Sequence, residues 1–190
     1  MNNLIFSICI LILSSFIEAK SANIKTVKHV DIEKFMGKWY VLYSTPTFFD
    51  KHATNATETY YFDYETSKIE IKYQYNKKSF LGPKKVINQK AKIVKNTNAE
   101  WRVSLFGGLI KMPYYIIDLN PEYRYTVVAS KNKKYFWILS RSASINPDTL
   151  KKINSRLELQ NYNLKLLKPM NHHNISHPLR DNPAPLPNKN

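Results

Sequence analysis

Three histidines near the C-terminus, His172, His173 and His177, are spaced closely enough to suggest a metal site. Imidazole is a common metal ligand, but ligation needs side chains that are held in a fixed geometry. The segment around them is rich in proline and asparagine, and its prolines are too frequent for a helix or a strand. We therefore expect residues 169–190 to be a disordered tail, and we predict no metal site.

The remaining residues lack the combinations that catalyse reactions. Cys9 is the only cysteine, and His29 and His52 lie far apart. Gly-x-Ser-x-Gly, His-Glu-x-x-His and phosphate-binding glycine loops do not occur, and Gly107-Gly108 is most simply a turn. Catalysis needs a nucleophile beside a base, paired acids or a metal cluster. We therefore predict no catalytic residue and no cofactor.

The N-terminal segment predicts export. An apolar run from Leu4 to Ile17 is too short to cross a bilayer, and Ala19-Lys20-Ser21 supplies small residues for cleavage. Residues 1–21 are interpreted as a signal peptide that takes Cys9 with it, so no thiol or disulfide is expected afterwards. Because no cysteine ends the apolar run, we expect a periplasmic or secreted protein without a lipid anchor.

Composition favours one β-rich domain. The chain has 190 residues, of which 43% are hydrophobic, with 13 Tyr, 9 Phe and only 4 Gly. Its formal net charge of +15 would suit nucleic acid, but export removes that partner from its usual compartment. We therefore expect no nucleic acid partner, and the basic character needs another explanation.

Apolar and polar residues alternate through most of the chain, as in half-buried β-strands. In residues 68–76 the side chains of Ile69, Ile71, Tyr73 and Tyr75 point one way, and the charged residues between them point the other. Eight such strands can close into an antiparallel up-and-down barrel that holds one small ligand. The predicted strands are Lys38–Ser44, Thr57–Tyr64, Lys68–Asn76, Val86–Lys95, Glu100–Phe106, Tyr114–Leu119, Tyr125–Ser130 and Lys134–Arg141.

A single helix is predicted after the strands. Asn146 can cap it, Pro147 suits its first turn, and one apolar face recurs up to Gln160. This helix should pack on the outer wall of the barrel, and Tyr162–Leu167 could add a short ninth strand. The expected domain is residues 22–168.

Three segments resemble motifs of one known family. Asp31-Ile-Glu-Lys-Phe-Met-Gly-Lys-Trp-Tyr opens the first strand and Tyr135-Phe-Trp-Ile-Leu-Ser-Arg closes the eighth, and Asn120-Pro-Glu-Tyr-Arg-Tyr-Thr-Val-Val precedes the seventh. This combination resembles the lipocalins, and most closely their bacterial branch of outer-membrane lipoproteins related to apolipoprotein D. The likeness covers about Val27 to Lys168 and implies a carrier of small hydrophobic molecules.

The resemblance also assigns structural residues. It implies that Trp39, two residues after Gly37, lies across the closed end of the barrel and that Arg141 packs over its ring. The sequence departs from the bacterial branch because it lacks the acylated cysteine, which argues against a membrane tether. No function is assigned to Glu122 or Tyr123, because the second motif matches only loosely.

The alternation of side chains along a strand, with a period of two residues, then predicts which residues line a ligand cavity. If Trp39 and Arg141 point inward, so do Val41, Tyr43, Tyr135, Trp137 and Leu139. The same residue types also fill ordinary cores, so each position could be packing instead. The candidate ligand-binding residues are Tyr43, Tyr60, Phe62, Ile71, Tyr73, Tyr75, Trp101, Val103, Tyr115, Trp137 and Leu139.

Lysines gather in the loops of one end. In an up-and-down barrel the first, third, fifth and seventh connections share the open end. These loops hold Lys51, Lys77, Lys78, Lys84, Lys85, Lys111, Lys131, Lys133 and, at the edge, Lys134. The other end holds chiefly Lys68 and Lys95, opposed by Glu65 and Glu122. Scattered lysines can be ordinary solvated surface, but this excess favours an anionic group at the mouth.

Three functions follow as hypotheses. The leading one is an exported carrier of a fatty acid, lysophospholipid or similar amphiphile, with its tail in the barrel and its head near the basic rim. The second is an interaction protein whose rim docks on an anionic membrane surface or a glycan. The third is a lipid-modifying enzyme on the same barrel, because a fold does not determine function.

Overall fold

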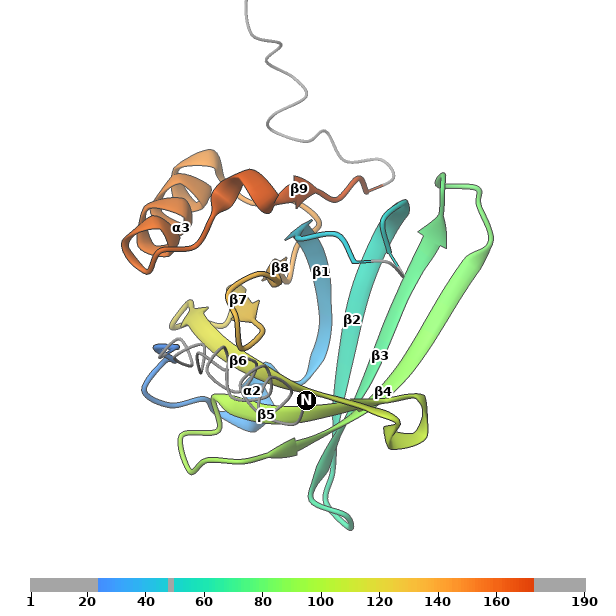
Figure 1. Cartoon of the computed structure of the whole chain (residues 1–190), viewed down its shortest axis with the longest axis vertical. Coiled ribbons are helices and arrows are strands. Elements are labelled where there is room, and N and C mark those ends of the chain that lie inside the picture. The colour runs from blue at the N-terminus through green and yellow to red at the C-terminus, as the bar shows by residue number, and fades with distance from the viewer. Residues whose placement is uncertain (1–23, 48–49, 173–190) are drawn as a thin grey trace, which may run out of the picture.

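The structure is a computed structural model that describes residues 24–47 and 50–172 (Figure 1). The signal peptide and nearly all of the tail expected from the sequence therefore lie outside the described residues. Within the described ranges, no helix has the length and apolar character needed to cross a membrane.

Antiparallel strands dominate the part of the chain that the structure describes, and the helices in it are short. The strands are β1 (Gly37–Ser44), β2 (Ala53–Asp63), β3 (Lys68–Lys77), β4 (Lys84–Ile93), β5 (Glu100–Leu105), β6 (Ile110–Leu119), β7 (Tyr125–Ala129), β8 (Phe136–Ser140) and β9 (Lys168–Pro169). The helices are α2 (Ile32–Phe35) and α3 (Pro147–Leu159), with 3-10 turns η1 (Phe106–Gly108) and η2 (Leu164–Leu166).

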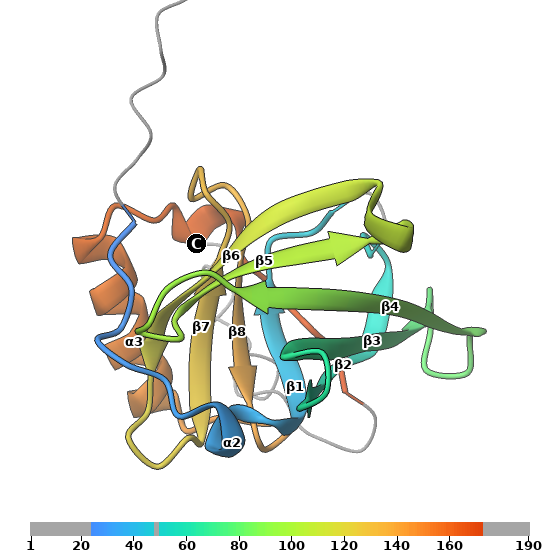
Figure 2. The same ribbon diagram turned by 90° about the horizontal axis from the view of Figure 1, so that it is seen from below.

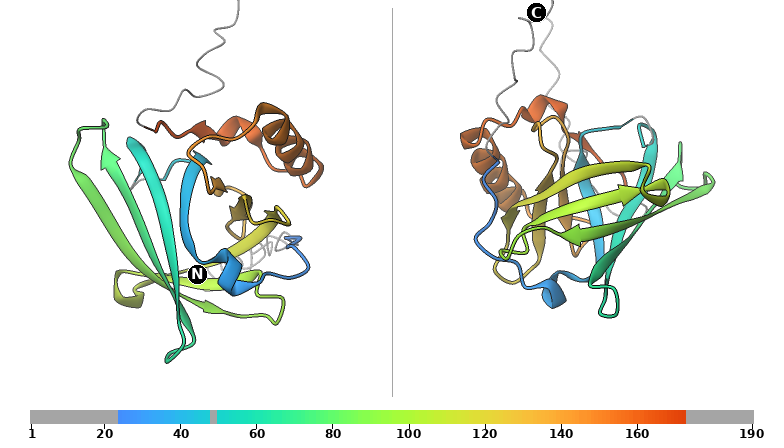
Figure 3. Two further views of the ribbon diagram at one scale, coloured as in Figure 1. Left: turned by 180° about the vertical axis from the view of Figure 1, so that it is seen from behind. Right: turned by 60° about the horizontal axis from the view of Figure 1, so that its bottom comes forward.

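Each strand from β1 to β8 pairs with its neighbour in the chain, and β8 pairs back to β1. The pairing of β1 with β2 joins the two ends of the sheet, so the strands form a closed barrel. All these pairings are antiparallel, so successive connections alternate between the two ends (Figures 1 and 3). The predicted eight-stranded up-and-down barrel is confirmed.

Helix α3 lies against the outside of the barrel, on the side opposite the β3–β4 hairpin (Figures 1 and 2). The Asn146 side chain accepts hydrogen bonds from the amides of Asp148 and Thr149, as an N-cap should. The buried face of helix α3 is formed by Leu150, Ile153 and Leu157. These residues join outward-facing residues of β6, β7 and β8 in a second apolar cluster, separate from the barrel interior. The predicted helix and its place outside the barrel are confirmed.

Two bulges interrupt the alternation that the sequence predicts. The register of β1 against β8 shifts between Val41 and Tyr43. The register of β6 against β7 shifts between Ile116 and Asp118. Because side chains alternate with period two, each shift reverses the face on which later residues of the strand lie.

The ninth strand lies later than expected. Residues Tyr162–Leu167, predicted as a strand, instead contain η2, which begins where the Asn163 side chain accepts from the amide of Lys165. The short β9 follows and pairs with the upper part of β1. The packed chain also continues beyond the expected boundary at Lys168, because Met170 and His172 are buried.

Residues 170–172 fill the seam beside the mouth, where β1 and β2 no longer pair. The Met170 amide donates to the carbonyl of Leu42 at 2.8 Å, and the Asn55 amide of β2 donates to the carbonyl of Asn171 at 2.8 Å. The Met170 side chain joins the apolar cluster of the barrel interior. The end of the described chain therefore bridges β1 and β2.

Candidate ligand-binding site

The closed end of the barrel is sealed by α2 and the start of β1. The Asp31 side chain caps α2 by accepting a hydrogen bond from the amide of Lys34. Phe35, the last residue of the helix, lies inside the barrel and is fully buried. Gly37 then turns the chain into β1 with a φ of +91°, a conformation that costs glycine little. The indole Nε1 of Trp39 donates to the carbonyl of Phe35 at 2.8 Å, which fixes the ring across the barrel floor.

The side chain of Arg141 contacts this floor from the outer side. Its guanidinium carbon is 3.7 Å from the centroid of the Trp39 ring, which is cation–π geometry. The same group donates to backbone carbonyls of the α2–β1 segment: Lys34 at 2.7 Å, Met36 at 2.8 Å and Lys38 at 2.8 Å. The arrangement implied by the family resemblance for Trp39 and Arg141 is therefore present.

An aromatic layer lies above the floor. Trp101 stacks on Tyr114 with centroids 5.0 Å apart and planes inclined by 8°. Phe35 meets both Trp101 and Tyr60 edge to face. The hydroxyls of Tyr60 and Tyr114 are 2.7 Å apart, and Tyr60 donates to the carboxylate of Glu58. The lower barrel is thus packed, with a small polar cluster at its upper side.

Glu58 is the ionisable member of that cluster. Burial raises its pKa to about 7, the nearby Asp50 charge adds to the rise, and the hydrogen bond from Tyr60 opposes it. Burial also raises the pKa of Tyr60 and Tyr114 well above the usual value. Glu58 retains some accessible surface although the barrel encloses it, which indicates that it faces internal space.

A second polar group lies near the mouth. Asp50, at the end of the first loop, accepts from the amide and hydroxyl of Thr47 at 2.7 and 2.6 Å. It also accepts from the hydroxyl of Tyr73 at 3.2 Å, and the ring of Tyr73 packs against Tyr75 with centroids 5.3 Å apart. Burial and the Asp50 charge raise the pKa of Tyr73. The loop is therefore fastened to the barrel wall by a buried carboxylate.

Toward the mouth, inward-facing residues keep accessible surface. Ile87, Leu105, Met112 and Trp137 pack against the interior cluster but are only partly buried. They come from β4, β5, β6 and β8, so they face one another across the upper barrel. The upper half of the barrel is therefore lined by apolar residues that the protein's own side chains do not fully cover.

Most of the predicted cavity residues lie in the barrel interior. Tyr60, Ile71, Tyr73, Tyr75, Trp101, Val103 and Leu139 are buried in the interior cluster, and Phe62 and Trp137 are partly buried against it. Val41, predicted to point inward, also belongs to this cluster.

Two predicted positions are wrong. Tyr43 and Tyr115 belong to the outer cluster under α3. The bulge after Val41 reverses the face of Tyr43. The prediction for Tyr115 is one residue out of phase: Tyr114 is the inward ring, and apolar residues lie on both faces of β6. Tyr135, also expected inside, belongs to neither cluster and lies near the ammonium of Lys134.

Sequence reasoning missed Glu58, Asp50 and Tyr114. Glu58 could have been found, because period two from Tyr60 and Phe62 points it inward. Asp50 could not, because its burial depends on how the first loop folds.

The mouth carries several of the predicted lysines, whereas Lys111 lies on the outward face of β6, paired with Ser104. Loops one and three meet at the mouth, since the Lys78 amide donates to the carbonyl of His52 at 2.7 Å. Lys77, Lys84 and Lys85 are exposed around them. Lys133 differs from the expectation: its ammonium donates to the carbonyl of Gln160 at 2.8 Å and so points to the end of α3.

Comparison with known proteins agrees with this architecture. The family model described as a lipocalin-like domain matches residues 30–172. Temperature-induced lipocalin-1 of Arabidopsis thaliana is 25% identical over 149 residues, covering 75% of this chain and 80% of the relative. Outer membrane lipoprotein Blc of Escherichia coli K12 is 28% identical over 130 residues, covering 66% of this chain and 70% of the relative.

Solved structures share the fold at lower identity. Insecticyanin from the tobacco hornworm Manduca sexta superposes with a TM-score of 0.63 at 14% identity. The superposition covers 78% of this chain and 84% of that chain.

Proposed function

The chain belongs to the lipocalin family, whose members bind small hydrophobic ligands, and we propose that it carries one amphiphile, a fatty acid or lysophospholipid, outside the cytoplasm. Lipocalins are generally binding or transport proteins rather than enzymes, and we assign no catalytic role to any residue. The apolar tail of the ligand occupies the upper barrel.

The observation that carries this proposal is the incompletely covered upper half of the barrel. Ile87, Leu105, Met112 and Trp137 pack against the interior cluster and keep part of their apolar surface accessible. Burying such surface against a ligand tail is favourable by about 25 cal/mol for each Å² removed from water. Each fully buried methylene therefore contributes about 0.8 kcal/mol.

The charges favour one orientation of the ligand. Glu58 and Asp50 lie inside, so a carboxylate or phosphate placed deep in the barrel would meet like charge in a poorly solvated site. Lys77, Lys78, Lys84 and Lys85 lie at the mouth, where an anionic head would meet opposite charge. The tail therefore points to the floor and the head stays at the rim.

Export is part of the proposal. The apolar N-terminal run and the small residues after it support a cleaved signal peptide, and the relative Blc is named an outer membrane lipoprotein. Because the only cysteine, Cys9, lies within the apolar run, we propose that the mature protein has no lipid anchor.

The test is a titration of the delipidated protein with a fluorescent fatty acid. We expect saturable binding of one ligand per chain, displaced by unlabelled fatty acid and by lysophospholipid. Met112→Trp, which fills the upper barrel, should weaken binding at least tenfold. Leu159→Trp, on the exposed face of α3, is the matched control and should bind like wild type.

Absence of saturable binding would overturn the carrier function. If the protein then bound vesicles through its rim lysines, the docking hypothesis would replace it. Turnover of a lipid ester, abolished by a single change in the barrel, would instead identify an enzyme.

A further inference from the structure

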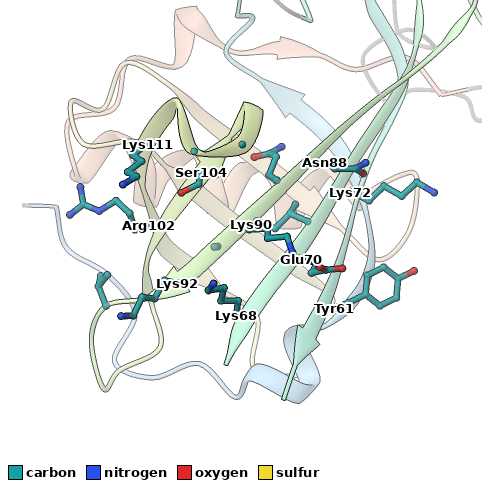
Figure 4. Close-up of a pocket in the computed structure, with 16 residues that line it drawn as sticks. Tyr61, Lys68, Glu70, Lys72, Asn88, Lys90, Lys92, Arg102, Ser104 and Lys111 are labelled. Carbon is teal, nitrogen blue, oxygen red and sulfur yellow. Dashed lines mark ion pairs between the residues drawn. The ribbon is translucent and has the colours of Figure 1, made fainter. Parts of the chain in front are cut away.

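The outer face of the sheet carries a second recess, separate from the barrel interior. Residues of β3, β4, β5 and β6 line a groove of about 960 Å³, with the η1 turn at one side (Figure 4). Most of them face outward, and Ile71, Gln89 and Ala91, which alternate with them along β3 and β4, also line it. The outward direction follows from the register. Ala91 and Val103 are paired and buried inside, so the neighbouring pair Lys92 and Arg102 points outward.

The groove is strongly cationic. Its positively charged lining residues are Lys68, Lys72, Lys90, Lys92, Arg102 and Lys111. Glu70 is the one acidic lining residue, and it forms an ion pair with Lys90 at 3.0 Å (Figure 4). Along a strand the outward side chains repeat every 7 Å or so, and neighbouring strands lie about 5 Å apart. The cations therefore form a closely spaced two-dimensional array.

One pair in this array is unfavourable for the folded protein. Lys92 on β4 and Arg102 on β5 are direct cross-strand partners on the same face. Like charges in this position destabilise a sheet. Within the described residues neither makes an ion pair with a carboxylate. Folding alone gives no reason for this juxtaposition, whereas a bound anion would neutralise both charges at once.

We propose that this outer groove binds a sulfated polysaccharide chain. A linear polymer with closely spaced sulfates matches both the array of cations and the recess, whereas a planar bilayer contacts a concave face poorly. Tyr61, 58% exposed at the edge of the groove, offers a ring on which the apolar face of a sugar can pack (Figure 4). The site is independent of the barrel interior and of the ligand proposed for it.

The test uses the full chain and a heparin octasaccharide as the probe. The groove variant combines Lys92→Gln, Arg102→Gln and Lys111→Gln. The control variant combines Lys151→Gln, Lys152→Gln and Lys165→Gln, exposed positions on or just after α3, and removes the same number of charges. We expect the groove variant to bind about tenfold or more weakly at low salt, with a shallower dependence of affinity on salt. The control variant should stay within about twofold of wild type.

Folding is checked separately. Removing the Lys92–Arg102 repulsion should leave the melting temperature of the groove variant at or above that of wild type, so lost binding could not be attributed to unfolding. Fatty-acid binding should also stay unchanged in this variant, which separates the groove from the barrel function.

Three outcomes would overturn the proposal. Equal losses in both variants would mean that only net charge is sensed. Binding of neutral maltooctaose as tight as that of the sulfated probe would mean that the sulfates are not recognised. Groove-dependent binding to vesicles of phosphatidylglycerol and phosphatidylcholine, without binding of the octasaccharide, would identify a membrane surface as the partner.

Discussion

The guanidinium of Arg141 lies over the ring of Trp39, with its central carbon 3.7 Å from the ring centroid. The contact joins the end of β8 to the start of β1, although 102 positions separate the two residues. It also places a cation on the outer side of the barrel floor, where four carbonyl oxygens of the α2–β1 segment accept its hydrogen bonds. The closed end is therefore held by one side chain that makes both contacts.

This relationship gives a prediction for stability. Trp39→Ala should lower the free energy of unfolding by about 3–5 kcal/mol, because a fully buried large ring is removed. Arg141→Ala should cost less, and the double variant should cost less than the sum, with a coupling of about 1 kcal/mol. Urea denaturation of the four proteins measures the cycle. Additive effects would show that the stacking contributes nothing to stability.

A second prediction concerns pH. The pKa of Glu58 is raised to about 7, so the folded protein holds this proton more tightly than the unfolded chain. Stability should therefore fall as pH rises from about 4.5 to 7, then level off. Glu58→Gln should remove this loss and exceed wild type by about 3 kcal/mol at pH 8, with no gain below pH 4.5. Denaturant unfolding at pH 4, 6 and 8 measures the difference.

The exposed Glu65→Gln serves as the control for Glu58, since it removes the same charge from the loop after β2. A gain of equal size in this control would assign the effect to net charge. An unchanged pH profile in Glu58→Gln would show that Glu58 does not titrate as described.

The rim gives a third prediction. Replacing Lys77, Lys78, Lys84 and Lys85 by Gln should weaken fatty-acid binding roughly tenfold at low salt, from about 0.3 kcal/mol for each exposed charge. The loss should shrink at high salt, because ions screen exposed charges over about 8 Å at physiological strength. A neutral lipid alcohol of equal chain length should bind as before. Equal losses for both ligands would mean that loop three shapes the cavity instead.

The seam at the mouth gives a fourth prediction. A chain ending at His172 should be more stable than one ending at Leu167 by about 3 kcal/mol. The shorter chain loses the bonds of Met170 and Asn171 to β1 and β2 and the burial of the Met170 side chain. Thermal unfolding of the two truncated proteins checks this. Equal melting temperatures would mean that β9 and the residues after it do not support the barrel.

Much of the barrel follows from local pattern. β3 alternates without interruption, so its bounds and its inward face are predictable from residues 68–76 alone. Helix α3 is predictable from its N-cap Asn146, from Pro147 in its first turn and from its one apolar face. Such features depend on residues that are close in sequence, which is why the fold could be predicted.

The site is less predictable because its key features depend on contacts between distant residues. Both faces of β6 are buried, one by the interior and one by α3, so apolar character cannot distinguish Tyr114 from Tyr115. The bulge in β1 that turns Tyr43 outward has no signal in the local pattern. Met170 follows a proline in a segment that resembles a tail, and it is held by contacts with distant residues: its amide donates to the carbonyl of Leu42, and its side chain joins the interior cluster.

The bridge between β1 and β2 also bears on the order in which the protein can be completed. His172 contacts the carbonyl of Val41 across 131 positions of sequence, so β1 leaves the ribosome long before its last neighbours are made. Pairing of such distant segments is intrinsically slow. The seam between β1 and β2 at the mouth can therefore be completed only after residues 170–172 have been synthesised.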